Sequence, residues 1–469
     1  MSSSAISIDA SRWEKKKLSD LGKLFCGQSP STKDVNTSGI GTVYVTGPEQ
    51  WDGSKVHLSK WTTAPKRVVP EGCIFITVKG AGVGKTFPGI ACSIGRDVYA
   101  FKPNDNVSEK FIYWAIIYSV QDVIRHAVGD IPGISKSHIL DHEIYAPPTI
   151  EEQHEVVSEI EKQFSRLDEA VTALKRIQAN LKRYKAAVLK AAVEGKLTEQ
   201  WRKDHPDVEP ADQLLKRILA ERRAKWEAEE LAKMKSKGIK PKDDSWRKKY
   251  KEPAGPDTAN LPELPEGWVW ARAEQVSDFI TKGTTPSATK LLEGGGDVRF
   301  LKVYNLTFSG RLNYNFKPAF VDQSVHQGEL ARSRVIASDV LINIVGPPLG
   351  QVSVVPAEIV EANINQAIAR YRPINGLSNR FLAYTLMTDS VMSWAIKRAK
   401  TTAGQSNLTL ELCRDLPIPL PSFVEQGQII DDIDRRLSVT EELETTIATN
   451  LKRAERLRQT ILQRAFSGG

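Results

Sequence analysis

Residues 149–195 read TIEEQHEVVSEIEKQFSRLDEAVTALKRIQANLKRYKAAVLKAAVEG, without proline or glycine before the last position. A second stretch of the same kind occupies residues 422–468, begins SFVEQ and holds one further glycine. In both, a hydroxyl residue is followed three positions later by glutamate, which predicts a reciprocal capping box. Pro148 and Pro421 precede the two caps and discourage the helix from extending backwards. Both stretches end at glycine, which readily takes the left-handed conformation that ends a helix. The pattern therefore predicts two long helices.

Apolar residues recur along the first stretch at alternating steps of three and four with one short step, the pattern of a coiled-coil seam with a stammer. They are Val157, Ile160, Phe164, Leu167, Val171, Leu174, Ile177, Leu181, Tyr184 and Val188. The second stretch has a less regular apolar side, made of Ile430, Ile433, Leu437, Leu443, Ile447, Leu451, Leu457 and Ile461. Such a helix extends roughly 65–70 Å, too long for an ordinary core helix. Each therefore needs a partner for its stripe, and the other copy is the nearest candidate; the alternative is two unrelated surface helices.

Length and composition describe an ordinary soluble protein with room for about three domains. The 469 residues include 41% hydrophobic and 26% charged side chains, and a net charge of +8 suits a polyanionic partner without requiring one. No apolar run reaches the ~20 residues of a membrane span, and the first residues lack the features of a signal peptide. Four cysteines without a CxxC spacing favour a reducing cytosol over disulfides or a zinc site, so we expect a cytoplasmic protein.

The segments that precede the two helices match each other at several points. The matched pairs are 27–31 with 283–287, 70–78 with 337–345, 108–114 with 378–384, and 144–148 with 417–421. Pro148 with Pro421 and Gln153 with Gln426 are both 273 residues apart. The chain is therefore predicted to be a duplicated unit of globule and long helix rather than a solenoid. The globules differ between the matched points, which fits one scaffold that carries two different recognition surfaces.

Residues 198–265 have no counterpart in the second half. Within them, 212–235 is predicted to be a solvated amphipathic helix and 235–256 an exposed linker. The basic run at 247–251 is either a solvated tether or a non-specific phosphate contact. The predicted boundaries are 1–146 for the first globule, 147–197 for the first long helix, 198–265 for the helical and basic linker, 266–419 for the second globule and 420–469 for the second long helix.

Motifs that would indicate catalysis are weak. Residues 79–86, KGAGVGKT, nearly match a P-loop, but Lys79 stands at the first required glycine and a strand-like segment follows in place of a helix. The better interpretation is a glycine-rich loop that can approach phosphate or base edges. His138 and His142 are four apart with no third ligand nearby. The sequence also lacks a Gly-x-Ser-x-Gly elbow and the Asn-Pro-Pro motif of amino-methyltransferases.

The repeated unit, its Pro-rich exits and the Glu-Gln helix starts resemble the specificity (S) subunits of type I restriction–modification systems. The resemblance covers nearly the whole chain, and 401–408 (TTAGQSNL) also matches the family's loop before the last strand. The corresponding loop of the first half, 129–136, departs from that pattern. The resemblance implies two α/β (α+β) target-recognition domains separated by two long antiparallel coiled-coil helices, with a pseudo-two-fold internal repeat.

The resemblance also implies the function and partners. Each recognition domain would read one half of a split sequence in double-stranded DNA, and the helices would fix the gap. Two methyltransferase (M) subunits and the motor–nuclease (R) subunits would be the protein partners. S-adenosylmethionine, ATP and magnesium would bind to those partners, so this chain would be non-catalytic and carry no cofactor.

Loop residues near glycine are the natural DNA contacts. The candidates are Lys79, Lys85, Ser135, Lys136 and Ser137 in the first half, and Lys302, Asn305, Gln351, Lys400, Thr402, Gln405, Ser406 and Asn407 in the second. Trp51 and Tyr304 either stack on bases or pack. Two other functions stay open at this point: a coiled-coil scaffold or RNA- or protein-binding adaptor, and an enzyme that uses residues 79–86.

Overall fold

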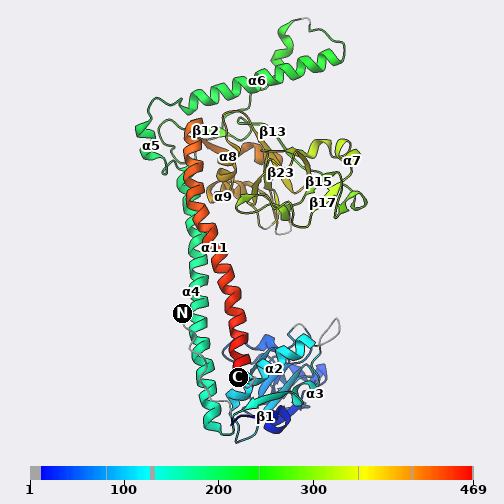
Figure 1. The fold of residues 1–469 in the computed structure, drawn as a ribbon. Coiled ribbons are helices and arrows are strands. Elements are labelled where there is room, and N and C mark those ends of the chain that lie inside the picture. The colour runs from blue at the N-terminus through cyan, green and yellow to red at the C-terminus, as the bar shows by residue number, and fades with distance from the viewer. Residues whose placement is uncertain are drawn as a thin grey trace. The chain divides into compact units, whose positions relative to one another are not determined.

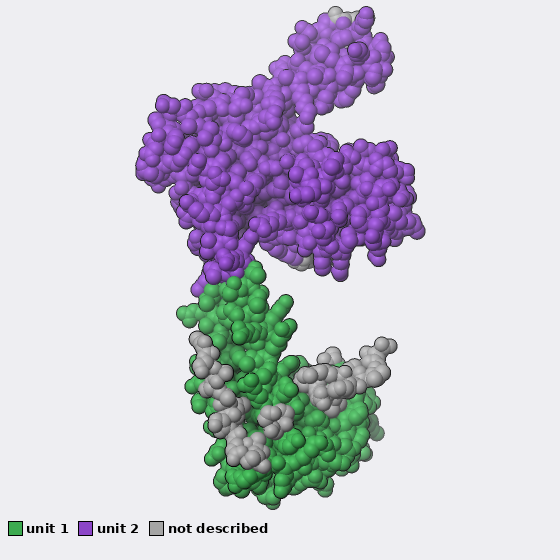
Figure 2. Space-filling model, viewed as in Figure 1, with its two compact units in different colours: residues 1–177, 445–469 green, residues 178–444 purple. Residues whose placement is uncertain are grey.

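The computed structural model describes residues 12–80, 82–126, 133–241, 243–346, 348–402 and 405–466. The chain forms two compact units, 1–177 with 445–469 and 178–444, coloured separately in Figure 2. Each unit contains one globule, the beginning of one long helix and the end of the other. Among the described residues, no helix is long and apolar enough to cross a membrane.

The two predicted long helices are present as α4 (Ile150–Val193) and α11 (Phe423–Phe466), each of 44 residues (Figure 1). The backbone N–H of Glu152 donates to Thr149 Oγ1 (3.2 Å), and that of Glu425 donates to Ser422 Oγ (3.2 Å). Gly195 has a φ of 66° and follows the end of α4, as predicted. The predicted glycine at the end of the second stretch, Gly468, lies outside the described residues.

The reciprocal half of the predicted capping boxes is wrong. Glu152 forms an ion pair with Arg12 instead (2.8 Å). Glu425 is buried, and its carboxylate accepts hydrogen bonds from Thr198 (2.6 Å), Arg202 (2.5 Å) and Trp268 (2.9 Å). Better donors than the local cap amide are available to both carboxylates, and sequence spacing does not reveal donors that are distant along the chain.

Within each unit the parts of α4 and α11 run antiparallel. In the first unit Asp168 pairs with Arg458, and Ile160, earlier in α4, shares an apolar cluster with Leu462, later in α11. In the second unit Lys185 pairs with Glu444 (2.6 Å), and Leu189, later in α4, shares a cluster with residues earlier in α11, among them Ile433. The predicted pairing of the two copies is thus confirmed.

The predicted seam is only partly buried. Val157, Ile160 and Phe164 are buried beside the first globule, and Val188 beside the second. Ile177 and Tyr184, by contrast, are 45% and 44% exposed. These two positions follow the short step in the pattern, where the apolar stripe rotates away from a single partner helix. The predicted seam, which contains a stammer, is therefore buried near its ends and exposed at Ile177 and Tyr184.

The two globules share one sheet topology, which confirms the predicted repeat. A first sheet has the order β2-β10-β7-β8 in the first globule and β13-β23-β19-β21 in the second, extended there by β16, and every pair in it is antiparallel except β16–β21. The strands are β2 (Gly22–Cys26), β7 (Ile74–Thr77), β8 (Thr86–Pro88), β10 (Val98–Pro103), β13 (Ser277–Lys282), β16 (Gly310–Arg311), β19 (Val340–Asn343), β21 (Val352–Val354) and β23 (Ile368–Pro373).

A second sheet of five strands is also repeated, in the orders β3-β5-β4-β9-β6 and β14-β17-β15-β22-β18. Its central pair, β4–β9 or β15–β22, is parallel, and the other pairs are antiparallel. The strands are β3 (Val35–Asn36), β4 (Thr42–Val45), β5 (Trp61–Thr62), β6 (Val68–Val69), β9 (Cys92–Ile94), β14 (Leu292–Glu293), β15 (Val298–Leu301), β17 (Ala319–Val321), β18 (Arg334–Ile336) and β22 (Glu361–Ile364).

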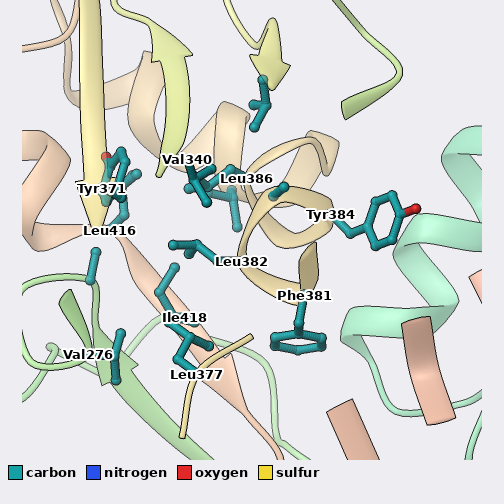
Figure 3. Packing of buried hydrophobic residues seen from close by; sticks show 14 of the residues in the cluster. Val276, Val340, Tyr371, Leu377, Phe381, Leu382, Tyr384, Leu386, Leu416 and Ile418 are labelled. Atoms are coloured by element: carbon teal, nitrogen blue, oxygen red, sulfur yellow. The ribbon is translucent and has the colours of Figure 1, made fainter. Parts of the chain in front are cut away.

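Helices cover the first sheet, and a two-stranded ribbon joins the entry of each globule to its exit. The helices are α1 (Leu18–Leu21), α2 (Glu109–His126) and α3 (Lys136–Leu140), then α8 (Asn379–Leu386), α9 (Asp389–Arg398) and α10 (Leu410–Asp415). The short helix α7 (Gln323–Gln327) lies beside the second sheet instead, where His326 bonds Asn363 of β22 at 2.7 Å. The ribbons are β1 (Glu14–Lys17) with β11 (Glu143–Ala146) and β12 (Val269–Arg272) with β26 (Pro417–Leu420). Figure 3 shows Phe381 and Leu382 of α8 packed with strand residues such as Val340 and Ile418. Burial of such side chains contributes about 1.5–3 kcal/mol each.

The glutamine of each Glu-Gln helix start joins the long helix to its globule. Gln153 accepts a hydrogen bond from the backbone N–H of Ser108 at the start of α2 (2.9 Å), and Gln426 accepts the equivalent bond from Ser378 at the start of α8 (2.8 Å). Each amide also donates to the proline carbonyl before its helix, Pro147 or Pro421. Both side chains are buried. We call Gln153 and Gln426 the latch glutamines.

The segment between the two halves is more ordered than predicted. It contains α5 (Glu199–Asp204), α6 (Ala211–Ser236) and the 3-10 helix η4 (Asp244–Lys249). Leu214 and Ile218 of α6 are buried in the second globule's core beside Gly376, where a Cβ would lie within 2.8–3.2 Å of them. The predicted solvated helix is therefore anchored on one side. The predicted exposed linker folds back, since Trp246 of η4 stacks on Trp226 of α6 at 6.1 Å.

Candidate nucleic-acid interface

In each globule a long loop directly follows the first strand of the parallel pair, β4 or β15. One buried side-chain amide braces each loop through hydrogen bonds. The loops are residues 46–61, up to the first residue of β5, and 302–317, which include the two-residue strand β16. The amides are Gln50 and Asn305, each 2% exposed. Both amides end a short 3-10 helix, η3 (Pro48–Gln50) or η6 (Val303–Asn305). We call them the bracing amides.

The two bracing amides make equivalent bonds. The side-chain oxygen of Gln50 accepts from the backbone N–H of Thr46 (2.7 Å), and that of Asn305 accepts from Lys302 (2.9 Å). Their backbone oxygens accept from His57 (2.7 Å) and Asn313 (2.8 Å). Asn305 also donates to the carbonyls of Asn313 (3.0 Å) and Phe316 (2.9 Å). A buried amide that satisfies several backbone groups fixes the conformation of the loop around it.

Asn305 was expected as a DNA contact from sequence. Its side chain is buried and bonded to backbone atoms of its own loop, so the structure gives it a positioning role. Direct contact with DNA stays a prediction for all the candidate residues. The equivalent residue Gln50 was missed because a single buried amide in a loop leaves no periodic signal.

In the first loop, 46–61, both acidic side chains have a nitrogen-bearing side chain beside them. Glu49 lies 3.6 Å from the ammonium of Lys60, and Asp52 pairs with His57 (2.7 Å). Backbone amides of Lys55 and Ser54 donate to Asp52 and hold its carboxyl pKa well below the usual range. Trp51 stacks on the buried Phe87 at 5.7 Å, so it packs within the globule, one of the two roles that its sequence left open.

The second loop, 302–317, carries cations and aromatic rings without an acidic residue. Tyr304 and Phe316 contact each other edge to face with centroids 5.9 Å apart. The ammonium of Lys302 lies 5.9 Å from the ring of Tyr304, and that of Lys317 lies 5.6 Å from the ring of Phe316. Alternating rings and cations are a common feature of nucleic-acid-binding surfaces. The signal was visible in the sequence, where KVYNLTFSGRLNYNFK holds four aromatic residues and three cations.

The candidates of the first half are brought to one edge of the first sheet. The backbone N–H of Ile134 donates to Val78 (3.1 Å), which places 133–137 beside the loop that carries the exposed Lys79 and Lys85. Ser135 caps α3 by accepting from the backbone of His138 (3.2 Å), and its hydroxyl lies 2.9 Å from that of Ser137. Lys136 is exposed. Residues 129–132 of the divergent loop lie outside the described residues.

The loop at 79–86 does not lead into a helix. Its backbone turns at 82–84 and enters β8 (Thr86–Pro88). This bears out the interpretation of 79–86 as a glycine-rich loop in place of a nucleotide-binding P-loop, which opens a helix.

The candidates of the second half are also gathered by backbone pairing. A small sheet has the order β20-β25-β24, with strands β20 (Val345–Gly346), β24 (Lys400–Thr402) and β25 (Gln405–Asn407). It places Lys400, Thr402, Gln405, Ser406 and Asn407 beside the strand that leads to Gln351. Gln351 in turn donates to the carbonyl of Leu306 (3.2 Å), directly after Asn305. Among these, the side chains of Lys400, Thr402, Gln405 and Ser406 lie outside the described part of the structure.

The sequence matches the model of one protein family, described as the type I restriction modification DNA specificity domain, over residues 10–183 and 265–453. The chain belongs to this family. Its relatives include the specificity subunits of the Escherichia coli type I restriction enzymes EcoDI and EcoBI. The first is 22% identical over 366 residues, covering 77% of this chain and 70% of the relative, and the second is 23% identical over 369 residues, covering 78% and 66%.

A solved chain from a type I restriction–modification system has the same fold. It covers 97% of this chain and 97% of itself with a TM-score of 0.63 and 16% sequence identity. The two stretches that match the family model each contain one globule and much of one long helix. The predicted resemblance and the predicted fold class are thus confirmed.

Proposed function

We propose that the chain is the sequence-specific DNA-binding specificity subunit of a type I restriction–modification complex. Each globule recognises one half of a bipartite double-stranded target, and the paired parts of α4 and α11 set the number of base pairs between the halves. The globules are accordingly named target-recognition domains 1 and 2.

One observation carries this proposal: two globules built on the same core sheet order present different loops at the same structural position. A duplicated scaffold with shared bracing and divergent loop chemistry suits the recognition of two different base sequences, because base edges are distinguished by the donors, acceptors and apolar groups placed against them. Membership of the DNA specificity family supplies the ligand class.

The long helices carry exposed apolar residues that suit protein partners. On α4 these are Ile177 and Tyr184, and on α11 they are Val439, Leu443 and Leu457. Apolar residues exposed in such number along helices commonly mark association surfaces. We infer that two methyltransferase subunits cover these faces and that motor–nuclease subunits join the complex for cleavage.

Catalysis and its cofactors belong to those partners in this proposal. The chain contributes recognition, whereas S-adenosylmethionine, ATP and magnesium bind to the methyltransferase and motor–nuclease subunits. We expect the complex to act in the cytoplasm, where DNA and these cofactors are present.

The proposal is tested by measuring binding of the full chain to duplexes that carry both halves of the target. We expect specific binding that weakens with salt and is abolished when either half is scrambled. Equal affinity for RNA, or for duplexes without either half-site, would favour the adaptor function instead.

The role of the helices has its own test. Insertion of the same number of residues after Ile177 in α4 and after Glu444 in α11 lengthens both helices together. We expect a changed gap with both half-site sequences unchanged, whereas a changed half-site sequence would contradict the assignment of spacing to the helices.

A further inference from the structure

We call the loop at 302–317 of target-recognition domain 2 the aromatic loop, because it exposes several large aromatic rings. Tyr304, Phe308 and Phe316 are 37%, 57% and 46% exposed. Large rings exposed together are costly in water and commonly mark a binding surface. The equivalent loop of target-recognition domain 1 packs its first tryptophan, Trp51, against Phe87 instead.

The aromatic loop is also held rigid. Asn305 bonds the backbone at both ends of the loop, and the hydroxyl of Tyr304 donates to the carbonyl of Lys317 (2.9 Å). Lys317 has a φ of 46°, a conformation that residues other than glycine seldom adopt. A rigid, exposed pair of rings loses little conformational freedom when it binds. The arrangement therefore favours a ligand that can open to admit the two rings in the positions they already hold.

The charges around the rings select the class of ligand. Lys302, Arg311 and Lys317 are the loop's ionised side chains, and it holds no aspartate or glutamate. Arg311 pairs with Glu441 (3.1 Å), whereas Lys302 and Lys317 lie over the rings. Duplex DNA combines phosphates, which attract cations, with stacked bases, whose apolar faces pack against aromatic rings. Two cations beside an exposed pair of rings therefore suit duplex DNA.

We propose that the aromatic loop inserts Tyr304 and Phe316 against a base step of the half-site bound by target-recognition domain 2 and unstacks it, while Lys302 and Lys317 contact the flanking phosphates. Domain 1, whose loop lacks this surface, binds its half-site without such deformation. The inference rests on the proposed function, because it assumes that each domain binds one half-site. It adds that the two half-sites are treated differently.

The loop's position agrees with this assignment. Gln351 bonds Leu306, and the backbone N–H of Val352 donates to Thr307 (3.0 Å). The loop is thus joined to Gln351, another predicted contact of the second half, and to the start of β21. A base step unstacked there would lie beside the residues that recognise its neighbours.

The test uses the full chain and duplexes with 2-aminopurine, a base whose fluorescence rises when it is unstacked, placed in one half-site at a time. We expect the fluorescence to rise in the domain 2 half-site and to stay flat in the domain 1 half-site. The double variant Tyr304→Ala/Phe316→Ala should remove the rise and weaken binding about tenfold or more. Phe423→Ala, which truncates an exposed ring elsewhere in the same unit, is the matched control and should change neither.

Three results would overturn the inference: a rise retained in the double variant, equal rises in both half-sites, or full DNA affinity in the double variant with loss of methyltransferase-subunit binding. The last would assign the aromatic loop to a protein partner. Failure of the wild-type chain to bind any bipartite duplex would instead reject the proposed function, so the two failures are distinguishable.

Discussion

The loops 46–61 and 302–317 occupy the same position in two globules of the same topology, yet they differ in nearly every exposed property. The first places a basic side chain or histidine beside each of its two acidic residues and packs Trp51, whereas the second exposes three aromatic rings and contains no acidic residue. The bracing amides Gln50 and Asn305 are equally buried and make equivalent bonds. The comparison teaches that the backbone support of a recognition loop can be kept while its chemistry changes completely.

A second difference between the halves has the largest expected effect on stability. Glu425 is buried with three donors, whereas Glu152 has the mostly exposed Arg12 as its partner. Glu425→Ala should lower the free energy of unfolding of the second unit by about 3 kcal/mol, because it leaves buried donors unpaired. Glu152→Ala should cost less than about 1 kcal/mol. Urea unfolding followed by hydrogen exchange of peptides from each unit measures both; equal losses would contradict the difference described here.

The latch glutamines should behave alike. Gln153→Ala and Gln426→Ala each remove a buried side chain that accepts from the backbone N–H at a helix start, and each should cost about 1–3 kcal/mol. The loss should be confined to the unit that contains the substitution. The same hydrogen-exchange measurement applies, with the exposed Gln178→Ala as control. A loss shared by both units would mean that the latches do not act separately.

The bracing amides give a separate prediction for the binding of each domain to its DNA half-site. Asn305→Ala should weaken recognition of one half-site about tenfold, a cost of about 1.4 kcal/mol, and Gln50→Ala should do the same for the other. Binding to duplexes with one half-site mutated separates the two effects. If either substitution relaxed both half-sites, the loops would not be independent readers.

The smallest expected effect concerns salt dependence. Lys302→Gln/Lys317→Gln should reduce the slope of log affinity against log salt by about 0.9 for each phosphate that the variant no longer neutralises. Lys248→Gln/Lys249→Gln, in the basic segment of η4, is the matched control and should leave the slope unchanged if that segment is a solvated tether. A drop in the control alone would move the phosphate contact from the aromatic loop to the segment between the halves.

Local patterns in the sequence were sufficient for the long helices and the repeat. The caps at Thr149 and Ser422 and the glycine at 195 depend on residues close together in the chain, and the repeat was found by matching such local patterns at a 273-residue offset. The partial exposure of the seam was less predictable. The short step before Ile177 rotates the apolar stripe around the helix, and burial of the residues after it depends on where the partner helix lies.

Contacts between distant residues were not predictable in the same way. Glu425 was expected to close a capping box, but its donors come from residues 198, 202 and 268. The folding back of η4 depends on Trp226 and Trp246, which are twenty positions apart. Asn305 and Gln50 are buried by the path of a loop that no periodicity records. The aromatic loop alone could have been recognised from composition.

The central claim is that two independent recognition domains share one scaffold, and methylation mapping tests it most directly. Cells would carry the chain with its methyltransferase subunit, either unchanged or with residues 13–146 replaced by the equivalent globule of another family member. We predict a bipartite methylated sequence in which the exchange alters one half-site and leaves the other half-site and the gap unchanged. Methylation of a continuous sequence, or a change in both half-sites after the exchange, would contradict it.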